Sequence, residues 1–298
     1  MVFVLIATAL LPVFILGWWI YRKDSMRPEP LPMLFKAFLF GVGSTLVTMI
    51  LVTPLQVLGL VDNEFGSVTE AMSVALFAAA IPEETAKLIM LWLFLRNNRH
   101  YDEYLDGIVY AACVGLGFAG AENILYVLMS EDWLVVGIMR ALTAVPAHFA
   151  MACAMGYFYS KRHFGDRSQL TMVCILAVPI IIHWIYDALA FSEGVLPAMS
   201  VAINIMFVAL IVFMYKNTKR SIAKLQKIDK ERMTPPPAPH EMPPIDMTQR
   251  RYDMPLPPPP PPAPQDMPPA DMTQRRYDTP PPAPPPFPGS ADNNSQQA

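Results

Sequence analysis

The chain has 298 residues, of which 53% are hydrophobic and 16% are charged, and its formal net charge is −3. This charge averages two parts of the chain that differ in composition, so by itself it says little about partners. We expect no nucleic-acid partner. The three cysteines lie inside apolar runs without the spacing of a metal-binding pair, which excludes a disulfide framework and a zinc ribbon.

The composition changes sharply near residue 216. Residues 1–215 are a succession of apolar runs, each long enough to cross a hydrocarbon core about 30 Å thick. Residues 216–232 form a basic juxtamembrane segment, and residues 233–298 are rich in proline. We therefore predict an all-α, polytopic membrane helix bundle over 1–215, followed by a cytoplasmic tail that is disordered because it cannot bury a core.

Seven membrane-spanning helices are predicted, and the first is interpreted as a retained anchor. Their bounds are 2–21, 33–61, 71–95, 105–129, 133–159, 170–191 and 195–215. The segments after the first, third, fifth and seventh spans are basic, whereas the other loops contain DNE, SED and SE. Because basic loops remain in the cytoplasm, the pattern predicts an N-out, C-in topology.

The fourth predicted span carries small residues at intervals of four. Ala111, Gly115 and Ala119 form this pattern, with Gly117 and Ala121 beside them. Small side chains let membrane helices approach closely, so we expect this span to lie inside the bundle.

Ionisable residues inside the predicted spans are the main functional signal. A charge at the centre of a bilayer costs from about 2.5 to more than 10 kcal/mol, so each such residue is a functional candidate. The third span contains Glu83, Glu84 and Lys87. The sixth contains His183 and Asp187, one helical turn apart.

The fourth and fifth spans add further polar residues. In the fourth, Phe118, Glu122 and Tyr126 share a face with Asn123 beside them, and the fifth contains Arg140 and His148. Counting about 1.5 Å per residue brings the acids and histidines of the four helices into one cavity between the midplane and the external face. Because Arg140 and Glu122 lie at nearly the same depth, we expect Arg140 to be the counter-ion of Glu122.

These residue types suit peptide hydrolysis. That reaction needs a base for water, a donor for the developing oxyanion and an acid for the leaving amine, and glutamate and histidine can supply all three. We expect one of Glu83 and Glu84 to be catalytic and the other structural. Asp187 is expected to accept an imidazole proton of His183 and so fix its tautomer.

The motifs together resemble the PrsW family of intramembrane proteases, in the CAAX-prenyl endopeptidase superfamily. The resemblance covers the membrane domain and rests on four motifs in order: EExxK at 83–87, FxxxEN at 118–123, His148 after Pro146, and HxxxD at 183–187. It implies a protease of the bacterial cytoplasmic (inner) membrane that cuts a membrane-anchored protein near the external face, as in members that trim an anti-sigma factor. It also implies Glu83 and Glu84 as base and partner, and His183 as a catalytic or oxyanion group, and it leaves His148 as the candidate second catalytic histidine.

Several alternatives remain open at this stage. Zinc would find sufficient ligands in Glu84, His148 and His183, but no HExxH motif is present, and we favour a site without a cofactor. A nucleophilic Ser or Cys is disfavoured because none pairs with a base. A secondary transporter or proton-coupled carrier is the main rival, although no inverted repeat is found. A lipid-modifying enzyme or a scramblase is a further alternative.

The tail contains a duplication, in which MPPIDMTQRRYDMP at 242–255 recurs as MPPADMTQRRYDTP at 267–280. Two identical DMTQRRYD cores among proline runs are typical of docking peptides for a cytoplasmic partner. A neutral tandem duplication would look the same. The basic segment 216–232 is interpreted either as a membrane-surface helix or as a charged extension of the last span.

Overall fold

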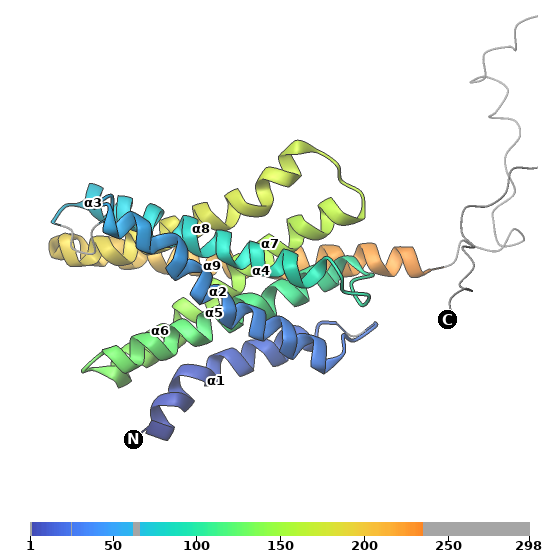
Figure 1. Ribbon diagram of the computed structural model, residues 1–298, viewed down its shortest axis with the longest axis horizontal. Coiled ribbons are helices and arrows are strands. Elements are labelled where there is room, and N and C mark those ends of the chain that lie inside the picture. The colour runs from blue at the N-terminus through green and yellow to red at the C-terminus, as the bar shows by residue number, and fades with distance from the viewer. Residues whose placement is uncertain (1, 25, 62–65, 235–298) are drawn as a thin grey trace, which may run out of the picture. The chain divides into compact units, whose positions relative to one another are not determined.

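The computed structural model describes residues 2–24, 26–61 and 66–234. The expected all-α membrane bundle is confirmed, since the described residues form helices and contain no strand (Figure 1). Residues from 235 onward lie outside the described ranges. The predicted disorder of the Pro-rich tail and the role of its duplicated motif therefore remain predictions.

Six helical stretches are long and apolar enough to cross a membrane. They comprise α1 (Val2–Tyr21), α2 (Leu31–Val57), α5 (Tyr104–Met129), the pair α6 (Trp133–Leu142) and α7 (Ala144–Phe164), α8 (Gln169–Val195), and a stretch from Pro197 that contains α9 (Ser200–Met233). Each coincides with a predicted span, with ends shifted by a few residues, except that α9 ends at Met233 and not near the predicted residue 215. The protein is therefore an integral membrane protein.

The remaining predicted span, 71–95, is not one regular helix. It is divided into α3 (Val68–Val74), a π-helical turn η1 (Ala75–Ala80) and α4 (Ile81–Leu95). Pro82, near the start of α4, has no N–H to donate and its ring crowds the preceding turn, so the hydrogen-bond register changes there. Glu83 and Glu84 follow this irregular turn directly.

The fifth predicted span is also interrupted, at Thr143 between α6 and α7. Pro146 cannot donate to the carbonyl of Leu142, and the backbone at Thr143 leaves the helical region with φ −123° and ψ −65°. This break separates Arg140 on α6 from His148 on α7, and it lets the two side chains approach Glu122 from different helices.

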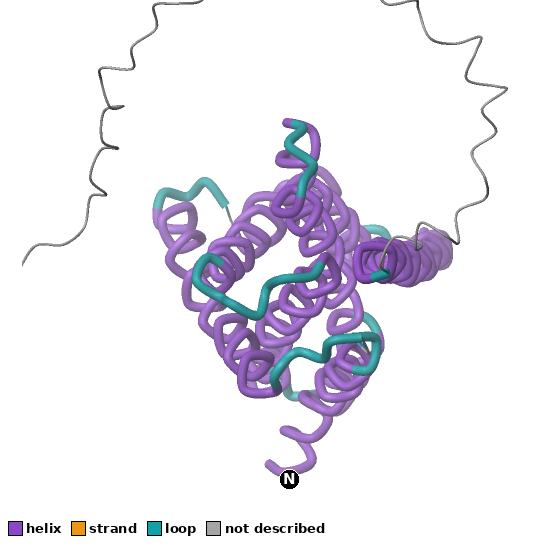
Figure 2. Tube along the Cα trace, turned by 90° about the vertical axis from the view of Figure 1, so that its right-hand side faces the viewer, coloured by secondary structure: helices purple, strands orange, loops and turns teal. Residues whose placement is uncertain are grey.

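The fourth predicted span, α5, lies at the centre of the bundle as expected. All residues from 105 to 120 are buried, and α5 contacts α1, α2 and α7. Figure 2 shows the described residues as packed helices joined by loops. A methyl group on Gly117 would collide with the carbonyl oxygen of Phe38 on α2, and one on Gly115 would collide with Ala152 on α7. The small residues thus permit close backbone contact.

The four basic connections meet at one end of the bundle. Arg27 contacts Glu103, the Tyr104 hydroxyl donates to the carbonyl of Phe164, and the Tyr104 N–H donates to Asp229 near the end of α9. This arrangement agrees with the predicted sidedness, which remains a prediction. Helix α9 continues without a break through residues 216–232, so the structure favours the charged extension of the last span.

Candidate functional site

Lys87 on α4 is the centre of a buried ionic group. Its Nζ lies 2.7 Å from Glu84 Oε1 and 3.4 Å from Glu83 Oε2, both one turn earlier. It also lies 3.0 Å from Nδ1 of His148 on α7, and 3.9 Å from the ring centroid of Phe118 on α5. One ammonium therefore holds two carboxylates in place and contacts two other helices.

His183 on α8 lies against the same pair of glutamates. Its Nδ1 is 2.9 Å from Glu84 Oε1, while its Nε2 is 3.1 Å from Asp187 Oδ2 and 3.7 Å from Glu83 Oε2. The expected contact with Asp187 is present. Carboxylates on both ring nitrogens fix the orientation of the imidazole.

Glu122 on α5 joins the other histidine to Arg140. Its Oε2 lies 2.8 Å from His148 Nε2 and 2.8 Å from Arg140 Nη2, so the expected pairing with Arg140 is present. Asn123 accepts from Arg140 Nε at 3.1 Å and donates to the carbonyl of Ala9 on α1 at 2.9 Å. These contacts position Arg140 and, through Glu122, His148.

All ten residues singled out from the sequence thus belong to one connected network. They are contributed by α4, α5, α6, α7 and α8. A further member is Tyr126, whose ring lies 3.8 Å from the guanidinium carbon of Arg140. It lies one turn after Glu122, on the helix face that the spacing predicts for Phe118, Glu122 and Tyr126.

Access differs between the two adjacent glutamates. Glu84 is fully buried, whereas the Glu83 side chain is 11% exposed and makes longer contacts. Glu122 and Asp187 are exposed to a similar degree, at 16% and 14%. Water can therefore reach the group on the side of these three carboxylates.

The donor set also fits a metal ion. Glu83, His148 and His183 each offer a ligand atom within 4.8 Å of the others, a set that contains Glu83 in place of the Glu84 considered from the sequence. Two histidines and a glutamate are a common set at catalytic zinc sites. Glu122 lies on His148 Nε2 and Glu84 on His183 Nδ1, so His148 Nδ1 and His183 Nε2 are the nitrogens that would face an ion. Lys87 Nζ lies 3.0 Å from His148 Nδ1 and would have to move away for an ion to bind there.

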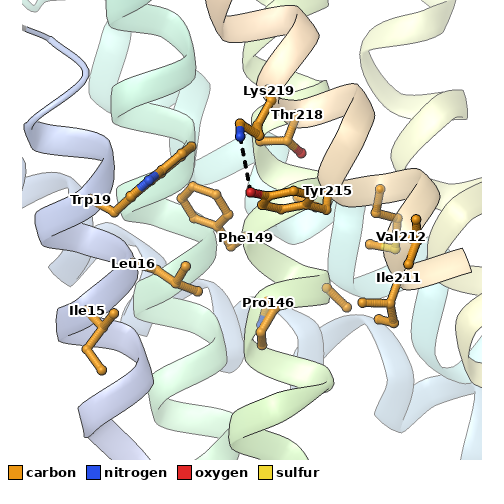
Figure 3. Close-up of a pocket in the computed structure, with 13 residues that line it drawn as sticks. Ile15, Leu16, Trp19, Pro146, Phe149, Ile211, Val212, Tyr215, Thr218 and Lys219 are labelled. Atoms are coloured by element: carbon orange, nitrogen blue, oxygen red, sulfur yellow. Dashed lines mark hydrogen bonds between the residues drawn. The ribbon is translucent and has the colours of Figure 1, made fainter. Parts of the chain in front are cut away.

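An apolar groove of about 430 Å³ lies on a different side of α7. Figure 3 shows Pro146 and Phe149 of α7 lining it with Leu16 of α1 and Ile211 of α9, and Lys219 donates to the Tyr215 hydroxyl at one end. None of the ten network residues lines this groove. The candidate catalytic group is therefore distinct from this groove.

Comparison with known proteins gives a consistent result. Residues 29–214 match the family described as PrsW family intramembrane metalloprotease. The chain is 34% identical over 190 residues to "Protease PrsW" of Clostridioides difficile strain 630, covering 62% of this chain and 78% of that protein. It is 33% identical over 192 residues to "Protease PrsW" of Geobacillus kaustophilus, covering 64% and 81%.

A third relative, "Protease PrsW" of Bacillus subtilis strain 168, is 30% identical over 187 residues, covering 62% of this chain and 82% of that protein. No solved structure matches the chain. The matched range contains α2 to α8 and with them every residue of the ionic group. The resemblance seen in four short motifs thus extends over most of the membrane domain, and the chain belongs to the PrsW family of intramembrane proteases.

Proposed function

We propose that this protease hydrolyses a peptide bond of a membrane-anchored protein near the predicted external face, using water activated by a glutamate. The observation that carries the proposal is the convergence of two adjacent glutamates, a lysine and two histidines from three helices within hydrogen-bond distance. Such a group contains a base, a cation and imidazole donors in a buried setting.

Glu83 is the group we propose as the base. Its contacts with Lys87 and His183 are 3.4 and 3.7 Å long, and part of its side chain is accessible. Glu84 is the structural partner, because Oε1 is held by Lys87 at 2.7 Å and by His183 at 2.9 Å. A fully buried carboxylate with two such partners can orient them but cannot receive water.

His183 and His148 are the proposed donors for the oxyanion and the leaving amine. His183 is oriented between Glu84 and Asp187, and His148 between Lys87 and Glu122. Oriented donors stabilise developing charge without reorganising during the reaction. If a zinc ion is bound, Glu83, His148 and His183 would hold it, and it would supply Lewis-acid polarisation of the scissile carbonyl.

The proposed substrate is a regulator of the anti-sigma-factor kind, anchored in the same bacterial cytoplasmic (inner) membrane. This choice rests on the family resemblance. The predicted topology places the accessible edge of the ionic group toward the external side and the C-terminal tail in the cytoplasm.

The test is cleavage of a single-span reporter by purified protein in liposomes. Glu83→Gln is expected to lower the cleavage rate about 10²- to 10⁴-fold, the usual contribution of a general base. Glu84→Gln, His148→Ala and His183→Ala should also be impaired. Glu131→Gln, which alters an exposed glutamate before α6, is the matched control and should cleave normally.

Undiminished cleavage by all four site variants would overturn the proposal. Exhaustive chelation distinguishes the mechanism without a metal from the zinc mechanism. If chelation abolishes activity and added zinc restores it, Glu83 is assigned as a zinc ligand. Activity that persists after chelation would assign it as the base.

A further inference from the structure

A second group of buried carboxylates lies where the basic connections meet. We call it the acidic cluster, and it consists of Asp24, Glu29, Glu103, Asp106 and Asp229. Each residue is at most 5% exposed. They belong to three parts of the chain, namely the α1–α2 connection, the start of α5 and the end of α9. None of them contacts the ionic group around Lys87 within ion-pair distance.

Asp24, Glu103 and Asp106 each use one carboxylate oxygen to accept from a backbone N–H group. Asp24 Oδ2 accepts from Glu29 at 2.9 Å, and Asp106 Oδ2 accepts from Glu103 at 2.6 Å. The Glu103 side chain accepts in turn from the backbone of Asp106, which completes a capping box at the start of α5. These carboxylates are therefore held in defined positions.

Each of the same three carboxylates has a second oxygen without a hydrogen-bond partner among the described residues. These atoms are Asp24 Oδ1, Glu103 Oε1 and Asp106 Oδ1, and all are buried. One oxygen from each of the three residues lies within 4.8 Å of the other two. Glu103 Oε1 lies 3.5 Å from Arg27 Nε, whereas Asp24 Oδ1 and Asp106 Oδ1 form no ion pair among the described residues either. Buried polar atoms are normally paired, so these two carboxylate oxygens indicate a missing partner.

The other two members of the acidic cluster are already satisfied. Asp229 accepts from the backbone N–H groups of Tyr104 and Leu105 at 2.8 and 2.9 Å. Glu29 accepts from the hydroxyl of Tyr110. They add negative charge to the cluster, and their remaining role is to attach α9 and the α1–α2 connection to α5.

Side chains do not neutralise this charge. Across the described part of the chain, Arg27 is the one cation within ion-pair distance of the cluster, at 3.5 Å from Glu103 Oε1, and its side chain is 63% exposed. A cavity of about 240 Å³ adjoins Asp24, Glu103 and Asp229, and its other lining residues include Lys23, Lys227 and Lys230. Those lysines form no ion pair with the cluster in the described structure.

We propose that Asp24, Glu103 and Asp106 bind a hard divalent cation of the Mg²⁺ class. The ligands offered are carboxylate oxygens alone, which favour such ions over zinc. Mg²⁺ is usually held by a few carboxylates and keeps several waters, which the adjoining cavity can accommodate. The ion would brace the α1–α2 connection against the start of α5, independently of the chemistry proposed above.

Shared protons are the alternative partner for these oxygens. Burial, opposed by a hydrogen bond from Tyr110 and reinforced by nearby carboxylates, raises the pKa of Glu29 to about 7. Burial and the charges of Asp229 and Asp24 raise the pKa of Glu103 to about 7. A cluster that held protons would respond to pH and not to Mg²⁺, which an experiment can separate.

The first test counts bound Mn²⁺, a paramagnetic probe for Mg²⁺ sites, on the full chain in detergent. The parent carries His148→Ala and His183→Ala, so that the candidate protease site does not contribute. We expect one Mn²⁺ per chain, displaced by excess Mg²⁺, and a loss of at least tenfold in affinity with Asp24→Asn and Asp106→Asn. Asparagine keeps an acceptor for the backbone N–H but removes the charge. Glu231→Gln, at an exposed carboxylate of α9, is the matched control.

The second test compares melting temperatures with Mg²⁺ and with a chelator at constant ionic strength. In chelator, Asp24→Asn with Asp106→Asn should melt higher than its parent, because repulsion is relieved. In Mg²⁺ the order should reverse, because the variant has lost the ligands. An unchanged order, or a parent that neither binds Mn²⁺ nor is stabilised by Mg²⁺, would overturn the proposal even if the variant failed to fold.

Discussion

The ionic group around Lys87 and the acidic cluster at the start of α5 accommodate buried charge in different ways. In the first, every described carboxylate has a cationic or imidazole partner, such as Lys87 for Glu84 and Arg140 for Glu122. In the second, backbone N–H groups fix the carboxylates, and Arg27 is the one described cation in contact. Side chains neutralise the charge of the first group. In the second group they do not, and we propose a bound divalent cation as the counter-charge.

The difference shows which kind of site a sequence reveals. Lys87 and His183 are conspicuous because they interrupt apolar runs. Asp24 and Glu103 lie in polar connecting segments, where acidic residues are ordinarily solvated. Only the packing of the α1–α2 connection and α9 against the start of α5 buries them. Buried charge in a loop is thus a property of tertiary structure.

The comparison predicts that removing the cation has a large effect on stability in the first group and a small effect in the second. Lys87→Met should lower the free energy of unfolding by about 3–5 kcal/mol, because it leaves buried carboxylates without their partner. Arg27→Met should change it by less than about 1 kcal/mol, because its exposed side chain makes a solvent-screened pair. Chemical denaturation of the full chain in detergent, with Mg²⁺ present, measures both.

Equal losses for the two variants would break the comparison, because they would make Arg27 the true counter-charge of the acidic cluster. Combining Lys87→Met with Glu84→Gln offers a further check. If Lys87→Met is destabilising because it leaves the buried carboxylate of Glu84 without a cation, then the double variant should be more stable than Lys87→Met alone.

The order and approximate position of the membrane spans could be predicted from the sequence, since apolar length and loop charge determine them. The interruptions of the spans at η1 and Thr143 could not. Pro82 and Pro146 were visible, but a proline in a membrane helix is accommodated as a kink, a π-turn or a break, according to the neighbouring helices. The composition change near residue 216 likewise did not predict that α9 continues to Met233.

The residues of the candidate site could be predicted, but their pairing only in part. Spacing along one helix anticipated the contact of His183 with Asp187, and depth anticipated that of Glu122 with Arg140. No pattern indicated that His148 lies between Lys87 and Glu122, because that contact depends on how α7 is rotated against α4 and α5. For the same reason the sequence did not distinguish the accessible Glu83 from the enclosed Glu84.

Helix α5 carries members of both groups, with Asp106 near one end and Glu122 about 24 Å along the helix. Gly117 lies between them against the backbone of α2. Gly117→Ala should cost about 1–3 kcal/mol, because the added methyl group collides with a carbonyl oxygen that cannot move freely. Gly194→Ala on α8, where a methyl group meets nothing within 4 Å, should be neutral or slightly stabilising.

The same variant tests whether the two groups respond independently. Displacing α5 should reduce both reporter cleavage and Mn²⁺ affinity if the helix moves as a rigid body. A loss of cleavage with unchanged Mn²⁺ affinity would show that α2 supports the ionic group alone, and a stable Gly117→Ala protein would contradict the packing argument.

The smallest expected effect comes from Asp166, a partly exposed counterpart of Asp24. Both accept a backbone N–H in a turn, but Asp166 also accepts from the Thr171 hydroxyl at 2.7 Å and lies 3.0 Å from Lys161. These partners hold the pKa of Asp166 well below its usual range, whereas burial raises the pKa of Asp24. Hydrogen-bond and ion-pair partners thus determine the pKa shift of Asp166, whereas burial determines that of Asp24.

A lowered pKa in the folded state stabilises the protein above the unfolded pKa of about 4, and this contribution is lost as the pH falls through the folded value. Asp166→Asn should therefore lower the melting temperature slightly at pH 7, and the difference from the parent should shrink below pH 4. Asp132→Asn, at an exposed residue whose side chain caps no helix, should show no difference at either pH. If the melting-temperature difference between Asp166→Asn and the parent stays constant with pH, the stabilisation comes from the hydrogen bonds of Asp166 and not from its charge. The contrast between Asp166 and Asp24 would then rest on burial alone.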